Sequence, residues 1–308
     1  MTKNHSLSGL DKFNKISKTS NALLNILLIV LCLLILFPIV FLVVLSISDE
    51  NSIRQYGYLL IPKSFSMEGF NFLFKQRTAI LKALGISLFT TIVGTVIGVM
   101  LNTTMGYAMS RKDYKLSKVL SWVVIIPMLF NGGMFATYVI VANMLHLKDS
   151  IWALILPLCV SSFNVIVCRT FFKQTVPDAL IESAKIDGAT QFRIFRSIVL
   201  PISLPVLATI ALFLMFAYWN DWYQSKLYIN DKDLFSLQAL LDLLIKEADF
   251  LAKNAGMLGG SYAEIARTMP KESSKMAIGV IIVLPIACAY PFFQRYFISG
   301  LTIGAVKE

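Results

Sequence analysis

Six long blocks of apolar residues divide the chain, and they constrain its fold more than any other feature. Each block can supply the roughly 17 to 25 residues with which an α-helix crosses the hydrocarbon core of a bilayer. Only 15% of the 308 residues are charged, against about 25% in typical soluble domains. The sequence therefore predicts an all-α polytopic membrane protein with six transmembrane helices. The expected helices lie within residues 22–45, 84–109, 119–145, 151–172, 198–220 and 276–293.

The charges between the blocks predict the orientation of the chain. With the N-terminus in the cytoplasm, the inner segments carry 15 Lys and Arg against 6 Asp and Glu, whereas the outer segments carry 13 against 12. Because cytoplasmic loops are enriched in Lys and Arg, both termini are expected in the cytoplasm. The prediction is a six-helix domain over 22–298 between a cytoplasmic N-terminal tail, 1–21, and a cytoplasmic C-terminal tail, 299–308.

Two outer loops, residues 46–82 and 220–275, are long and are expected on the extracellular side. Within the second, residues 236–252 place leucine and isoleucine at helical spacing, which predicts a short amphipathic helix. The alternative, a solvated connector, stays open because residues 254–262 are rich in glycine.

The composition argues against nucleic acid, metal and enzymatic chemistry. The net charge of +10 lies between apolar blocks rather than along one soluble face, so the expected partner of these charges is membrane lipid and not nucleic acid. The four cysteines form no CxxC pair, and His5 and His146 are far apart. We therefore expect no metal, no cofactor and no catalytic residues.

The inner loop between the fourth and fifth blocks, residues 173–197, has the turn chemistry of two short helices. Pro177 suits a first helical turn, and Asp178 complements the positive end of a helix dipole. Gly188 stands where a left-handed residue would end the first helix, and Thr190 can cap the second.

One face of the first expected helix is small, slightly acidic and apolar. It consists of Ala179, Glu182, Ser183 and Ile186. Such a face fits a cleft on another protein, and a cytoplasmic loop without a partner would not need it.

The same loop resembles the EAA signature of membrane subunits of ATP-binding-cassette (ABC) importers. Glu182-Ser183-Ala184, three residues, Gly188, nine residues and then Ile198-Val199-Leu200-Pro201 match EAA-x3-G-x9-I-x-LP, with Ser183 where alanine is usual. The resemblance implies a type I ABC importer permease fold in which this coupling loop contacts an ATPase. The coupling residues that it implies are Glu182, Ser183, Ala184, Asp187, Gly188 and Ala189.

Further motifs are similar to the carbohydrate-uptake branch of these permeases, the group that contains the smaller maltose-type permease and Gram-positive complex-oligosaccharide permeases. They are Asn131-Gly132-Gly133, Trp152 through Pro157, Trp219-Asn220-Asp221-Trp222, Met269-Pro270 with Met276-Ala277, and Gly300 through Lys307. The resemblance implies a bacterial cell membrane location, a second permease subunit, two cytoplasmic ATP-binding subunits and an extracellular solute-binding lipoprotein. The transported sugar or oligosaccharide stays open.

The chain lacks the machinery to supply its own energy. It contains no G-x-x-x-x-G-K-[ST] phosphate loop, and no carboxylate pair lies in the middle of a block, which argues against ion-coupled transport. The sequence thus favours an ABC permease that is not itself an enzyme. Two alternatives remain, a permease for a non-sugar solute and a membrane scaffold.

Polar and aromatic residues at the end of the fifth block and in the interior of the third are candidates for a translocation path or its outer gate, since sugar hydroxyls and ring faces favour such groups. The candidates are Tyr218, Trp219, Asn220 and Asn131. An interfacial aromatic belt is the alternative for Tyr218, Trp219 and Asn220. The apolar C-terminal tail is expected to dock on the ATPase.

Overall fold

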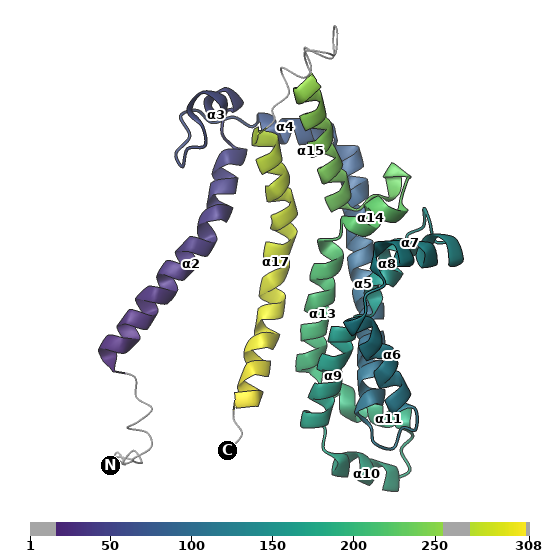
Figure 1. Cartoon of the computed structure of the whole chain (residues 1–308). Helices are drawn as coiled ribbons and strands as arrows, with labels where there is room; N and C mark the ends of the chain where they lie inside the picture. The colour runs from purple at the N-terminus through teal and green to yellow at the C-terminus, as the bar shows by residue number, and fades with distance from the viewer. Residues whose placement is uncertain (1–16, 255–271, 306–308) are drawn as a thin grey trace. The chain divides into compact units, whose positions relative to one another are not determined.

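We describe a computed structural model of the chain, which covers residues 17–254 and 272–305 (Figure 1). All regular elements in these residues are helices, and one isolated bridge joins Ser48 and Phe65. This confirms the all-α prediction. The described residues form two compact units, 17–71 with 272–280, and 72–254 with 281–305.

The first unit contains α2 (Lys18–Ser46), α3 (Glu50–Tyr56), the start of α4 (Glu68–Lys75) and the first turns of α17 (Glu272–Ala305). The Ser17 hydroxyl caps α2 by accepting the Ser20 N–H at 3.1 Å. No residue in the most apolar window of α2 is buried in the chain. This window therefore offers its apolar surface to lipid or to another subunit.

A buried carboxylate holds the start of α17 in the same unit. Glu50 is 5% exposed and accepts hydrogen bonds from the backbone N–H groups of Glu272 at 3.0 Å and Ser273 at 3.1 Å. It also accepts a hydrogen bond from the Ser273 hydroxyl at 3.2 Å and forms an ion pair with Arg54 at 3.2 Å. A carboxylate is favoured here because the free N–H groups at the start of a helix carry partial positive charge.

The second unit is built around α5 (Arg77–Ser110), which packs against α8 (Trp152–Cys159), α9 (Ser162–Thr175) and α13 (Leu204–Trp219). Glycine permits this approach, because a Cβ atom on Gly94 would lie only 2.3 Å from the Tyr218 ring. Close packing against a small residue of this kind stabilises helix pairs in membranes, where burial of apolar surface gives little driving force.

Short helices connect these four. They are α6 (Ser117–Leu129), α7 (Gly133–Tyr138), α10 (Asp178–Ile186), α11 (Gln191–Ile194), α12 (Leu200–Ile202), α14 (Tyr223–Tyr228) and α15 (Leu237–Asn254), with π-helical turns at Val139–Met144 and Phe195–Val199 and a 3-10 turn at Lys232–Leu234. Helix α15 confirms the helix predicted over 236–252. Helix α17 runs to Ala305, so most of the expected tail 299–308 continues the last helix. The prediction that this tail docks on the ATPase concerns side chains that lie outside the described residues.

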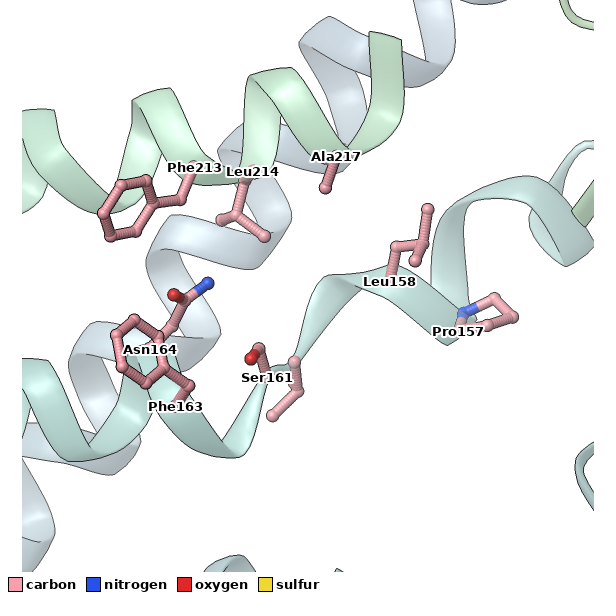
Figure 2. Close-up of a pocket in the computed structure, with 9 residues that line it drawn as sticks. Pro157, Leu158, Ser161, Phe163, Asn164, Phe213, Leu214 and Ala217 are labelled. Carbon is pink, nitrogen blue, oxygen red and sulfur yellow. The ribbon is translucent and has the colours of Figure 1, made fainter. Parts of the chain in front are cut away.

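Three of the predicted membrane helices are interrupted. The block 119–145 breaks between α6 and α7, where Gly133 has φ +75° and the Asn131 side chain accepts the Gly133 N–H at 2.8 Å. The block 151–172 bends by 44° between α8 and α9, at Val160 and Ser161 (Figure 2). The block 198–220 bends by 82° at Ser203. Pro205 explains the last bend, because proline cannot donate to the preceding turn and its ring clashes with it.

These interruptions bear on the number of membrane crossings. In the described residues, α2 and α5 are long and apolar enough to cross a bilayer, and each bent pair adds one crossing if its two helices act together. Length and composition thus support two to four crossings. The count of six stays a prediction.

Candidate functional site

The loop 173–197 folds as two short helices joined at Gly188, as predicted. Helix α10 begins after Pro177 and ends at Ile186, and Gly188 follows with φ +77°. The Gly188 N–H donates to the Lys185 carbonyl at 3.0 Å and the Ala189 N–H to the Ala184 carbonyl at 2.9 Å. This is the Schellman pattern of a helix ended by a left-handed residue. Thr190 caps α11 by accepting the Arg193 N–H at 3.4 Å.

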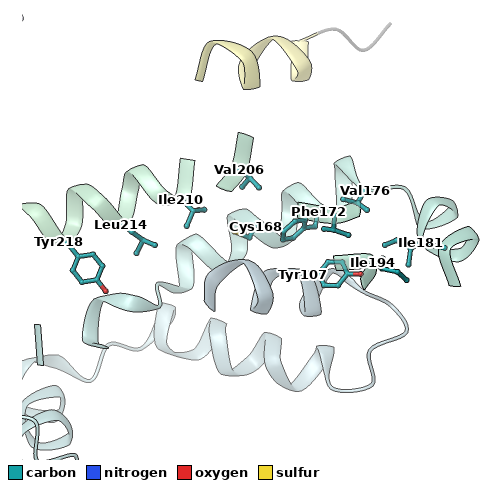
Figure 3. Close-up of a cluster of buried hydrophobic side chains, with 12 residues drawn as sticks. Tyr107, Cys168, Phe172, Val176, Ile181, Ile194, Val206, Ile210, Leu214 and Tyr218 are labelled. Carbon is teal, nitrogen blue, oxygen red and sulfur yellow. The ribbon is translucent and has the colours of Figure 1, made fainter. Parts of the chain in front are cut away.

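One face of α10 is anchored in the main apolar core of the second unit. Ile181 and Ala184 are buried there with Tyr107, Phe172 and Ile194 (Figure 3). The Tyr107 and Phe172 rings meet edge to face with centroids 5.8 Å apart, a favourable arrangement for aromatic pairs. The core therefore fixes which side of α10 points away from the protein.

The opposite face is free. Ala179, Glu182, Ser183 and Ile186 are all exposed, and Ile186 is 86% exposed. Asp187, Gly188 and the half-buried Ala189 continue this surface past the end of the helix. The predicted coupling residues are thus brought together on one projecting turn, except for Ala184, which belongs to the buried face.

Ion pairs hold both ends of α10 to the loop between α5 and α6. At its first turn, Asp178 pairs with Arg111 at 2.6 Å and with Lys112 at 3.4 Å. At its last turn, Lys185 pairs with Asp113. We call these five residues the loop ion pairs. They fix the orientation of α10 around the buried face, because its two ends are held independently.

The carboxylates of the loop ion pairs are charged at neutral pH. The hydrogen bond from Arg111 lowers the pKa of Asp178, and the hydrogen bond from Lys185 lowers the pKa of Asp113. A lowered carboxyl pKa means that the stabilisation is present above the ordinary Asp pKa of about 3.9 and disappears only as the pH falls through the lower folded-state pKa. The loop ion pairs therefore persist at every physiological pH.

Sequence reasoning missed the loop ion pairs. It used the loop 111–118 only to orient the chain, yet Arg111 and Asp178 are 67 positions apart and meet at the same end of the protein. The loops 111–118 and 173–197 both contain acidic and basic residues. This signal is too general to predict which acid pairs with which base.

The four candidate path residues do not form one cluster. Tyr218 is 2% exposed and donates its hydroxyl hydrogen to the Ile155 carbonyl at 2.7 Å. Trp219 is 5% exposed and its indole N–H donates to the Ile282 carbonyl at 3.2 Å. Asn220 is exposed at the end of α13, and Asn131 is exposed after α6. In this conformation the first two make contacts within the chain, and their role in transport stays a prediction.

Comparison with known protein families identifies the family of this chain. The sequence model of the binding-protein-dependent transport system inner membrane component family matches residues 94–303. The chain belongs to this family. The match covers α9, the loop 173–197 and α13, so the loop described above is part of the family's shared region.

Relatives with similar sequences cover nearly the whole chain. Protein LplC of Bacillus subtilis is 37% identical over 88% of this chain and 89% of that protein. The polygalacturonan/rhamnogalacturonan transport system permease protein YtcP of Bacillus subtilis is 35% identical over 91% and 95%. The arabinooligosaccharides transport system permease protein AraQ of the same organism is 28% identical over 92% and 95%.

A solved structure has the same fold. A chain of a bacterial ABC transporter involved in the import of the acidic polysaccharide alginate superposes with a TM-score of 0.77, covering 92% of this chain and 99% of that chain at 22% identity. The protein is therefore a multi-pass permease subunit with the type I fold and not an enzyme, since ATP hydrolysis takes place on separate subunits. Its family works with an ATPase and a solute-binding protein.

Among the described residues, no group of three His, Cys, Asp or Glu side chains is arranged to hold a metal ion.

Proposed function

We propose that this chain is a permease subunit of an ABC importer that carries a sugar or oligosaccharide into the cytoplasm. The observation that carries the proposal is the projecting face of α10, held by the loop ion pairs and ended by the left-handed Gly188. The names of YtcP and AraQ, both oligosaccharide or polysaccharide transport permeases, support the sugar assignment.

The proposed complex has five chains. This subunit and a second permease form a heterodimer in the cell membrane, two cytoplasmic ATP-binding subunits bind the coupling loops, and an extracellular lipoprotein delivers the solute. When ATP closes the ATPase dimer, α10 moves with the cleft into which Glu182, Ser183 and Gly188 project. Because Ile181 and Ala184 are fixed in the core, this motion passes to α5, α9 and α13 and turns the bundle outward.

The experiment that tests the proposal begins with the lipoprotein. Its binding on a glycan array identifies the sugar, and uptake of that sugar is then measured in vesicles that contain the whole complex. We expect accumulation that requires ATP on the cytoplasmic side and this chain. Uptake of a peptide or metal complex instead would favour a non-sugar permease, and no uptake of any solute would favour the scaffold.

The proposed orientation has its own test. Lys115→Cys lies in the inner loop and should resist a membrane-impermeant thiol reagent in intact cells, whereas Asn254→Cys in the outer loop should react. The parent chain, with its four native cysteines, gives the background, and permeabilised cells should label Lys115→Cys. The reverse pattern would place α10 outside the cell and contradict the proposal.

The path residues Trp219 and Asn220 are tested by a double variant chosen because Trp219 is buried. Alanine at Trp219 would leave a cavity, which typically costs about 3–5 kcal/mol for a buried aromatic residue. Trp219→Phe with Asn220→Ala removes the indole N–H and the amide but keeps most of the bulk. If these groups serve the path or gate, we expect uptake to fall several-fold with the complex intact. Unchanged uptake would return both residues to the aromatic-belt interpretation.

A further inference from the structure

A cavity lies beside the interruption between α8 and α9, a pair of helices that is a candidate membrane crossing. A space of about 480 Å³ lies beside Val160 and Ser161, bounded on the other side by α13 (Figure 2). This volume falls in the range of about 300–1,000 Å³ that is typical of small-molecule sites. Helix α8 places eight residues before the break, or about 12 Å at 1.5 Å per residue. In a crossing formed by the α8–α9 pair, the break lies about 12 Å from its start and so falls inside a hydrocarbon core about 30 Å thick.

A buried amide on α5 holds the interruption in place. Asn102 is fully buried; its side-chain nitrogen donates to the Cys159 carbonyl at 2.8 Å and its oxygen accepts the Ser161 N–H at 3.2 Å. The Asn102 side chain thus provides hydrogen-bond partners for one backbone carbonyl before Val160 and one backbone N–H after it. The break is a fixed feature of this fold rather than a frayed helix end.

Two polar groups at the cavity have no partner in the part of the chain that the structure describes. The Val160 N–H donates to no acceptor there, and the Asn164 amide, although 5% exposed, makes no hydrogen bond. An unsatisfied polar group in hydrocarbon costs several kcal/mol, so broken backbone at membrane depth is found only against protein or water. These groups indicate that the cavity is not filled by acyl chains.

Two aromatic rings complete the wall. Phe163 on α9 and Phe213 on α13 are 54% and 40% exposed, and their centroids lie 6.3 Å apart with the planes tilted by 42°. Aromatic faces pack against the C–H face of a sugar ring, while an amide and a hydroxyl such as Asn164 and Ser161 pair with its hydroxyl groups. None of the nine lining residues carries a charge, so a uronate carboxylate would find no counter-charge among them.

We propose that this cavity is a sugar-contact site on the translocation path, that it takes a neutral sugar unit, and that Phe163, Asn164 and Phe213 bind it. The proposal rests on the proposed function and assigns part of the substrate site to this chain rather than to its partner permease. The preference for a neutral sugar unit concerns this cavity alone, and other parts of the translocation path can still accept charged units.

Cysteine accessibility in the assembled complex tests the site. Ser161→Cys and Phe213→Cys are treated in membrane vesicles with a charged methanethiosulfonate reagent. Val96→Cys is the matched control, because Val96 is 65% exposed on α5 but does not line the cavity. It lies at the level of the break, since Gly98, within one turn of it, has a Cβ position 2.9 Å from the Cys159 carbonyl. Both cavity variants should label at least tenfold faster than the control. Labelling no faster than the control would overturn the proposal.

Protection by sugars tests the chemistry. Arabinotriose, raffinose and trigalacturonate are added before the reagent. At least one neutral sugar should slow labelling of Phe213→Cys several-fold, and Asn164→Leu in the same chain should remove that protection while labelling persists. Labelling that no sugar slows, or that only trigalacturonate slows, would overturn the neutral site. Co-purification of the ATPase, measured in every sample, shows separately whether the proposed function stands.

Discussion

Replacing Gly188 by valine is expected to reduce sugar uptake and binding-protein-stimulated ATP hydrolysis together, by roughly 5- to 150-fold, without loss of the chain from the membrane. Gly188 has φ +77°, a conformation that is a genuine outlier for a β-branched residue. A Cβ atom there would meet nothing within 4 Å, so the whole cost is backbone strain of about 1–3 kcal/mol. That free energy corresponds to the stated range.

The control for this prediction is Gly188→Asn. Asparagine enters the left-handed region far more readily than valine and adds a side chain of comparable size into the same open space. We expect near-normal uptake from it. Normal transport by Gly188→Val in reconstituted vesicles would remove the basis for assigning residues 173–197 to coupling.

Reversing the charge of Lys185 is expected to give the second largest effect. Lys185→Asp places a carboxylate next to Asp113 and replaces attraction with repulsion at the last turn of α10. Partly exposed ion pairs contribute about 0.2–1 kcal/mol each, and the repulsion has a similar size. The lost attraction and the new repulsion together amount to about 0.4–2 kcal/mol, so we expect transport and coupled ATP hydrolysis to fall about 2- to 30-fold, with the ATPase activity that needs no binding protein less affected.

A second change separates orientation of α10 from direct contact with the ATPase. Adding Asp113→Lys restores opposite charges with their positions exchanged, and it should recover most of the lost activity if the pair acts by orienting the helix. Lys173→Asp makes the same charge change at an exposed residue near the end of α9 and should have little effect. A double variant as impaired as Lys185→Asp would show that Lys185 acts on the ATPase itself.

Local sequence chemistry predicted the structure of the loop 173–197 well, because that structure depends on neighbouring residues. Pro177, Gly188 and Thr190 specify where each helix starts or ends from within a few positions, and the structure has these boundaries. The exposed face of Ala179, Glu182, Ser183 and Ile186 also followed from helical spacing alone.

The interrupted helices and the loop ion pairs could not be predicted in the same way. A window of apolar residues has the same hydropathy whether or not the helix breaks inside it, so 151–172 gave no signal at Val160. What stabilises that break is Asn102, which lies 57 positions from Cys159. The pairs of Arg111 with Asp178 and of Asp113 with Lys185 likewise join residues that only the packing of α5 against α9 brings together.

A photo-crosslinking residue at position 182 tests the central claim most directly, that the exposed face of α10 receives energy from a partner ATPase. Glu182 is exposed on that face, and position 254, which lies on the opposite side of the membrane in the proposed orientation, serves as the control. The account predicts an adduct between position 182 and an ATP-binding subunit in the assembled complex, with a yield that changes when ATP is added, and no such adduct from position 254. An intact complex in which position 182 links only to lipid, or to no ATP-binding subunit, would contradict it.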